Sequence, residues 1–212
     1  DWSRMTIDLA TGGQSSILSR YLDRGVGECR FDEYLRRDEL AAVSVLHDLG
    51  AYLELFLDIL EDPALSGLAE DLPYDDAGRL AIEGFTPRTD LLPLLTGEFT
   101  LAIASEPVPG PMAEMMPMSM VLALGADDGR ALLDGILEIA AGFAGEDVSV
   151  DLSGMLAAFE PEMVGEFEFV ALPFLALATS GDFLVLANDA EGLRDMLATP
   201  TGDLDVPDGL AW

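Results

Sequence analysis

The sequence predicts an α+β fold, in which an antiparallel-rich sheet carries amphipathic helices on one face. Short apolar runs that end in turn residues alternate with longer stretches whose apolar residues recur every three to four positions. Two of the apolar runs, Phe99–Ser105 and Met118–Gly125, read as a central hairpin, and Asp127-Asp128 then opens a helical pattern. Hairpins packed beneath helices are typical of this class.

The chain divides into an N-terminal arm with short helices, residues 1–39, and a single α+β domain, residues 40–212. In the arm, Ser16 can cap a short helix that Gly25 ends, and Phe31–Arg37 favours another turn or two of helix. Leu40–Leu46 then has the alternation of a strand. Asp48 begins the strongest helical pattern, with one apolar stripe formed by Leu49, Tyr52, Leu53, Phe56, Leu57 and Leu60.

The elements between this helix and the central hairpin are shorter. Asp62-Pro63 ends one helix and starts a second, because proline is tolerated at the first helical position. We then expect a turn at Pro73–Gly78, a strand at Leu80–Phe85 and a short helix from Thr89 or Asp90 to Leu95. Gly97 turns the chain into the hairpin.

After the hairpin, the Asp128 helix aligns five apolar residues: Leu132, Leu133, Ile136, Leu137 and Ala140. Val148–Leu152 favours a strand, and Leu152–Met163 fits either helix or coil. Glu166–Leu172 alternates as a half-exposed strand should. Finally, the sequence predicts a hairpin of Phe174–Ser180 and Phe183–Ala187 around Gly181-Asp182, and a last helix with Asn188 and Glu191 spaced as a capping box.

Three segments share the order strand, acidic cap and amphipathic helix, so we expect the sheet to be built from repeated strand–helix (ββα-like) units. The units span about 40–96, 97–147 and 166–199, and Leu46, Leu124 and Ala187 occupy corresponding positions. The spacing of these units exceeds the usual solenoid periods, which favours one sheet over an open array.

The order of Leu40–Leu46, an acidic-capped helix, Asp62-Pro63, Leu91–Ala102 (LLPLLTGEFTLA) and the Asp127-Asp128 helix resembles a bacterial family of unknown function, domain of unknown function thirty-three fifty-two. The resemblance covers Leu40 to Thr199. Members of that family are often exported or membrane-anchored. The resemblance implies an extracytoplasmic location (periplasm, envelope or secreted) and a non-enzymatic role.

Composition excludes several classes of function. Acidic residues outnumber basic ones 40 to 10, for a net charge of -30, and a field of that sign repels nucleic acid. No apolar run approaches the roughly 18 residues that cross a bilayer. The chain begins at Asp1 without methionine, which is compatible with a lost N-terminal anchor or export signal.

The sequence assigns no catalytic residue and no cofactor. All ten cations are arginines, so lysine chemistry is excluded, and no G-x-S-x-G elbow accompanies the sole histidine, His47. We interpret His47 as structural and the sole cysteine, Cys29, as unreactive. Paired carboxylates are expected by chance in so acidic a chain, and those at Asp127-Asp128 and Asp189 are simple helix caps.

One stretch stands out, the Met/Pro-rich loop 107–120 between the strands of the central hairpin. It holds four prolines and five of the nine methionines, whereas most hairpin loops have two to five residues. Thioethers at this spacing can bind Cu(I), for which the candidates are Met112, Met115, Met116, Met118 and Met120. Polarizable methionines also make an adaptable surface for a protein partner, with candidates Pro109, Pro111, Met112, Met115 and Met116. A third reading is local packing of the loop over the core.

The sequence therefore predicts a non-catalytic, extracytoplasmic subunit that docks a protein partner or larger assembly through the loop. Two alternatives stay open: a periplasmic Cu(I)-binding protein that uses the same methionines, and a carrier of an apolar ligand held between sheet and helices.

Overall fold

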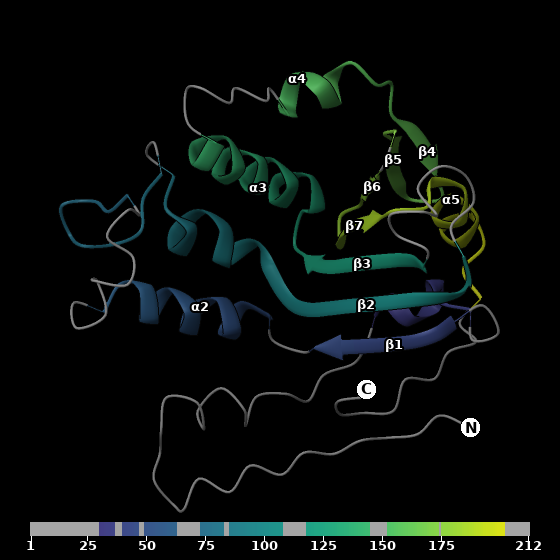
Figure 1. The fold of residues 1–212 in the computed structure, drawn as a ribbon, viewed down its shortest axis with the longest axis horizontal. Coiled ribbons are helices and arrows are strands. Elements are labelled where there is room, and N and C mark those ends of the chain that lie inside the picture. The colour runs from purple at the N-terminus through teal and green to yellow at the C-terminus, as the bar shows by residue number, and fades with distance from the viewer. Residues whose placement is uncertain are drawn as a thin grey trace, which may run out of the picture.

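The computed structural model describes residues 30–36, 40–46, 49–62, 73–82, 85–107, 118–144, 152–173 and 175–201. Within these ranges the chain forms one antiparallel sheet of seven strands in the order β1-β2-β3-β7-β6-β5-β4. Figure 1 shows the strands coloured by their position along the chain. The strands are β1 (Leu40–Leu46), β2 (Leu95–Pro107), β3 (Met118–Ala126), β4 (Glu162–Val164), β5 (Phe167–Ala171), β6 (Ala176–Thr179) and β7 (Phe183–Ala187).

Four α-helices and three short helical turns accompany this sheet in the described ranges. The α-helices are α2 (Leu49–Leu60), α3 (Gly129–Ala144), α4 (Leu152–Ala157) and α5 (Ala190–Ala198). The turns are η1 (Phe31–Tyr34), η3 (Pro87–Leu91) and η4 (Leu92–Leu94). Helices and an antiparallel sheet in one chain confirm the predicted α+β class. None of the helices in the described ranges is long and apolar enough to cross a membrane.

One face of the sheet packs against α5 and η1. Its core joins Leu193 and Leu197 of α5 with Phe31 and Tyr34 of η1, and every second residue along the central strands points into it. These inward strand residues include Ala102, Val121, Ala123, Phe183, Val185 and Ala187.

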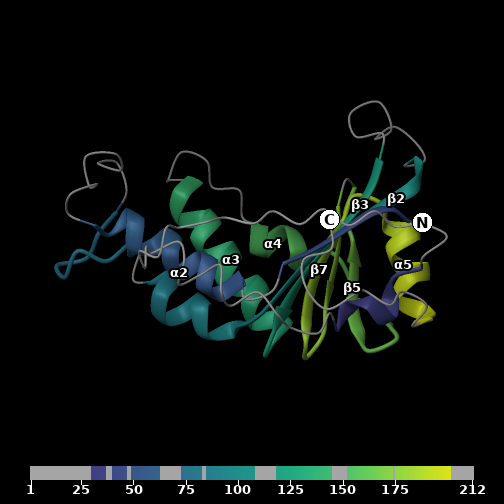
Figure 2. The ribbon, with the colours of Figure 1, turned by 90° about the horizontal axis from the view of Figure 1, so that it is seen from below.

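The opposite face packs against α2, α3 and α4. Leu132 and Leu133 of α3 and Leu156 of α4 lie in a second core with Leu184 and Leu186, the residues of β7 that point away from α5. Figure 2 shows α5 on one side of the sheet and α3 and α4 on the other. The prediction that the helices lie on a single face is therefore wrong. The helical period locates the apolar side of each helix, but both faces of this sheet are apolar and accept a helix.

The repeated strand–helix unit is not confirmed. The aligned positions Leu124 and Ala187 point to opposite faces of the sheet, since Leu124 packs with α3 and Ala187 lies in the core beneath α5. β3 and β7 are antiparallel neighbours, so the helices that follow them also leave from opposite ends of the sheet. The similar sequence order at these two junctions therefore leads to different packing.

The junction between β3 and α3 depends on two residues, Asp128 and Gly129. Asp128 Oδ1 accepts hydrogen bonds from the amides of Arg130 and Ala131, each at 3.0 Å, which confirms the predicted acidic cap. The Gly129 amide donates to the Ser180 carbonyl at 3.0 Å. A Cβ at Gly129 would lie 2.0 Å from the Phe183 carbonyl oxygen, so glycine lets the helix begin against the β6–β7 turn.

Several other predicted elements differ in detail. Leu80–Phe85 is not a strand of the sheet, because Leu80 and Ile82 form only isolated bridges with Tyr74 and Phe85. Gly97, at φ +100°, lies inside β2 at a register shift and does not precede the strand. The stripe on α2 is not wholly inward, since Leu57 is buried but Phe56 is 55% exposed.

Two C-terminal predictions differ in part. The stretch Leu152–Met163, expected as helix or coil, holds α4 and a turn, and only its last two residues belong to β4, a strand of three residues that is too short to carry a period. The last helix is capped by Asp189, whose side chain accepts from the Gly192 amide at 3.1 Å, and not by Asn188 with Glu191. Asn188 instead bonds to β3.

The domain boundary at residue 39 stays a prediction. In the described part of the arm, residues 30–36, Phe31, Tyr34 and Leu35 are buried in the core with α5. The rest of the arm, residues 1–29 and 37–39, lies outside the described residues, as do the helices expected after Ser16 and Pro63 and most of the strand expected at Val148–Leu152.

Candidate functional site

The hairpin of β2 and β3 extends beyond both of its neighbours in the sheet. The pairing of β1 with β2 ends at Ala104, and the pairing of β7 with β3 ends at Val121. The hairpin continues past these points to the pair Pro107↔Met118. We call residues 105–107 and 118–120 the hairpin stalk, which Figure 2 shows rising from the end of the sheet. The stalk carries the Met/Pro-rich loop.

Asn188, the residue between β7 and the Asp189 cap, holds one side of the stalk. Its Oδ1 accepts from the Met120 amide at 2.7 Å, and its Nδ2 donates to the Met118 carbonyl at 2.9 Å. Its own amide donates to the Met120 carbonyl at 3.4 Å. The side-chain amide thus substitutes for a strand residue where the β7 ladder ends, and it satisfies stalk backbone groups that lack a neighbouring strand.

Two of the predicted copper ligands lie on this stalk. Met118 is 52% exposed and Met120 is partly buried. Because they are two residues apart on one strand, both side chains stand on the same face of β3. The structure therefore brings two thioethers to one side of the stalk, beside the loop.

The other predicted site residues lie outside the described ranges: Pro109, Pro111, Met112, Met115, Met116, His47 and Cys29. Their roles as partner surface, Cu(I) ligands or structural residues stay predictions. Across the described residues, no group of three His, Cys, Asp or Glu side chains could hold a metal ion.

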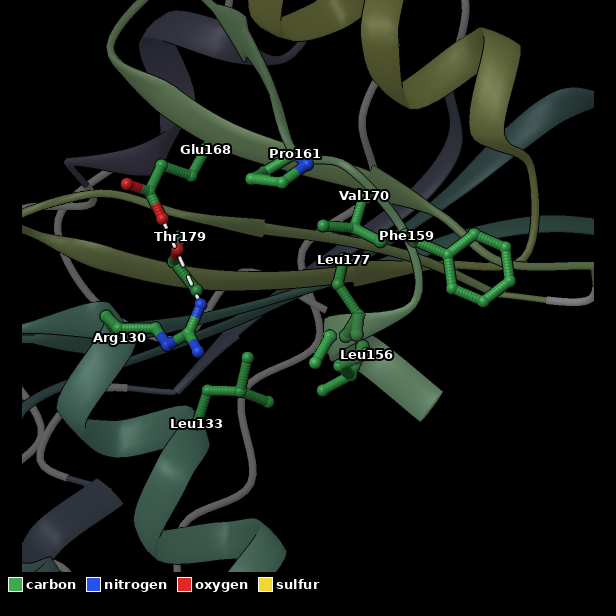
Figure 3. A pocket seen from close by; sticks show the side chains of 10 residues that line it. Arg130, Leu133, Leu156, Phe159, Pro161, Glu168, Val170, Leu177 and Thr179 are labelled. Carbon is green, nitrogen blue, oxygen red and sulfur yellow. Dashed lines mark ion pairs between the residues drawn. The ribbon is translucent and has the colours of Figure 1, made fainter. Parts of the chain in front are cut away.

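A pocket of about 170 Å³ lies on the face of the sheet opposite α5. Its floor consists of two cross-strand pairs of β5 and β6, the apolar pair Val170↔Leu177 and the polar pair Glu168↔Thr179. Helix α3, helix α4 and the turn after α4 form the walls, shown in Figure 3, with Arg130, Leu133, Leu156, Ala157, Phe159 and Pro161. The sequence predicts an apolar space between sheet and helices, and it does not predict which residues line it.

Charged side chains stand at one end of this pocket. Arg130 Nη1 lies 4.0 Å from Glu168 Oε2, which is an ion pair without a direct hydrogen bond. The Arg130 Nε donates to Asp134 Oδ1 at 3.2 Å. Thr179, opposite Glu168, is only 6% exposed and lines the pocket.

A buried carboxylate, Glu98, ties residues 30–36 to the sheet. It accepts hydrogen bonds from the amides of Arg30 (2.9 Å) and Phe31 (3.0 Å) and from Thr100 Oγ1 (3.2 Å). Arg30 also lies 3.8 Å from Glu98, as an ion pair. These hydrogen bonds and the ion pair satisfy the negative charge of Glu98 and cap η1, so the structure gives Glu98 a structural role. Sequence reasoning missed it, because its partners are distant in the chain.

Tyr34 is a second buried polar group that the sequence does not single out. Its hydroxyl donates to Glu166 Oε1 at 2.7 Å, and its ring packs edge-on against Phe167. Burial raises the pKa of Tyr34 well above its ordinary value, and the hydrogen bond and negative charge of Glu166 raise it further. The group is neutral at physiological pH and connects η1 to the β4–β5 turn.

Comparison of the chain with models of protein families, with curated proteins and with solved structures gives no match. The resemblance carried by Leu91–Ala102 stays a prediction.

Proposed function

We propose that this protein is a non-catalytic interaction subunit, acting outside the cytoplasm, which docks a protein partner through the Met/Pro-rich loop 107–120. The observation that carries this proposal is the hairpin stalk. It lifts the ends of the loop past the sheet and is held there by three hydrogen bonds from Asn188. A loop on a fixed support loses less conformational entropy on binding than one on a mobile support.

The chemistry of the loop and of the body favours a particular partner. Five methionines supply soft, adaptable contacts, and four prolines limit the conformations that the loop samples. The net charge of -30 attracts a basic surface and accelerates its approach. The expected partner therefore combines an apolar cleft for the loop with a positively charged rim. The resemblance to an often exported family supports a location outside the cytoplasm.

The test replaces residues 108–117 by Asn-Gly, a two-residue connection that suits a tight hairpin. Because the stalk pairs of β2 and β3 remain, we expect the variant to keep its thermal midpoint within a few degrees. A photo-crosslinker at Met115 in the natural host should capture one defined protein. A crosslinker at the exposed Ala157, on a different part of the molecule, should not capture it.

The same defined partner should be lost when the loop is replaced. Unchanged assembly of the replacement variant, or equal capture from Met115 and Ala157, would contradict docking through the loop. Fractionation of the host tests the location separately, and recovery with the cytoplasmic proteins would contradict that part of the proposal.

A second candidate, Cu(I) binding, is favoured by Met118 and Met120 on one face of the stalk. Thioethers are soft ligands that select Cu(I) over harder ions, and Met112, Met115 and Met116 precede these two residues in the same loop. Titration with Cu(I) under reducing conditions should show one tight site that weakens at least tenfold in a Met118→Ile, Met120→Ile double variant. The control is Met163→Ile, at an exposed methionine of β4. Equal affinity in the wild type and the double variant would rule out these two ligands.

A further inference from the structure

The pocket between α3, α4 and the β5–β6 floor is a separate candidate binding site. It lies across β7 and β6 from the hairpin stalk, so it uses none of the residues proposed for docking. We infer that it binds a small neutral molecule with an apolar body and one hydroxyl group, of the class of phenols and short alcohols.

The size of the pocket limits the ligand. Its volume of about 170 Å³ is below the roughly 300 Å³ at which pockets for drug-sized ligands begin. It is close to an apolar cavity of about 150 Å³ known to accept benzene. The ligand therefore has about seven to nine non-hydrogen atoms, since a single ring with one or two substituents fills such a space.

The apolar side chains that line the pocket determine the apolar part of the ligand. Leu133 and Leu177 are buried and form the inner surface, together with Val170 opposite Leu177. Leu156 and Phe159 close the side formed by α4 and its following turn, as Figure 3 shows. A ring placed among these side chains removes apolar surface from water on both partners, which favours binding.

The polar end of the pocket selects the functional group. Arg130 and Glu168 already form an ion pair, so a charged ligand group would have to give up its hydration and compete with one of them for its partner. A hydroxyl both donates and accepts. It can accept from Arg130 and donate to Glu168 across their 4.0 Å separation, where the two side chains do not reach each other directly.

Thr179 supports the same assignment. It is a buried residue of the floor, directly opposite Glu168, and it lines the pocket. A threonine hydroxyl both donates and accepts, so it can form a hydrogen bond with a ligand hydroxyl.

The test compares four probes of similar size on the full chain by isothermal titration: p-cresol, toluene, benzoate and benzylamine. We expect p-cresol to bind with a Kd on the order of 0.1 to 1 mM, typical of so small a ligand. Toluene should bind about tenfold more weakly, because it lacks the hydroxyl. Benzoate and benzylamine should bind still more weakly. Thr179→Val should weaken p-cresol severalfold and leave toluene unchanged.

Two variants with the same substitution locate the site. Ala157→Phe places a ring in the pocket and should abolish p-cresol binding. Ala198→Phe is the matched control, because Ala198 is likewise an exposed alanine that ends a helix, and it lines a different depression. It should bind p-cresol as the wild type does.

A measurement on the wild type makes the test independent of how the variants fold. The methyl resonances of Val170, Leu133 and Leu177 should shift on addition of p-cresol. Shifts confined to other methyl groups, or p-cresol affinity no greater than that of toluene, would overturn the inference. Because loop replacement leaves this pocket intact, p-cresol should bind that variant normally, so the two proposals can fail separately.

Discussion

Glu98 illustrates at the residue scale how one buried carboxylate is accommodated in a chain with a net charge of -30. The carboxylate receives two backbone amides and a threonine hydroxyl, and Arg30 stands beside it. Gly125 leaves room for this cluster, because a Cβ there would lie 2.6 Å from Thr96 Oγ1 and 3.0 Å from Glu98 Cβ. Neither residue is recognisable from sequence alone, since one of 40 acidic residues and one of 21 glycines carry no local signal.

Tyr34 leads to a prediction about pH. Its pKa is raised in the folded state, so the folded protein retains the hydroxyl proton at pH values where the unfolded chain has lost it. The contribution of Tyr34 to stability is therefore complete below about pH 10, the ordinary pKa of tyrosine, and declines as the pH rises above it. Tyr34→Phe should lower the free energy of unfolding by about 1 to 2 kcal/mol at pH 7, through loss of the bond to Glu166.

Urea unfolding at pH 7, 9 and 11 checks this. The difference in stability between the wild type and Tyr34→Phe should shrink between pH 9 and 11. The control is Tyr74→Phe, which removes a hydroxyl bonded to the backbone carbonyl of Leu60. A difference between wild type and Tyr34→Phe that stays constant up to pH 11 would argue against a raised pKa.

At the element scale, the stalk shows how one asparagine extends a sheet beyond its last strand. The sequence predicts both strands of this hairpin, because each contains a long apolar run, but β2 begins at Leu95, before the predicted start at Phe99. It predicts a capping box of Asn188 with Glu191, since asparagine three residues before glutamate fits that pattern, and it also reads Asp189 as an acidic helix cap. The structure uses the next residue, Asp189, for that purpose, and Asn188 is free to bond to β3. Local patterns could not distinguish these two arrangements.

Replacing Asn188 measures the support that it gives the stalk. Asn188→Ala removes two side-chain hydrogen bonds and should cost about 1 to 2 kcal/mol, or roughly 2 to 8 °C in Tm for a chain of this size. Amide exchange at Met120 should accelerate. Glu191→Ala is the comparison variant, because a capping box would make it equally costly, whereas the structure predicts a change within about 0.5 kcal/mol. Equal losses in the two variants would favour the capping box.

At the scale of the whole molecule, the α+β class could be predicted because composition and periodicity both report on local structure. The faces of the sheet on which the helices pack could not be predicted. α3 and α5 have similar apolar stripes, yet they pack on opposite faces of the sheet. The pocket could not be predicted for a related reason, since the residues that line it come from four elements, with Arg130, Leu156, Val170 and Leu177 as examples. The Met/Pro-rich loop stands out in the sequence because its length and composition are local properties.

The strand order has one consequence for how the molecule is made. Every strand pairs with its neighbour along the chain except at the junction of β3 with β7, a seam of five residue pairs. Residues 40–126 can therefore assemble their meander while the ribosome is still synthesising the remainder. Residues 162–187 then form a second meander, whose paired residues lie closer together in the chain than those of β1 and β2. Only the pairing of β3 with β7 requires both meanders. A chain released before Phe183 is synthesised would leave the backbone of β3 without β7 as its neighbour.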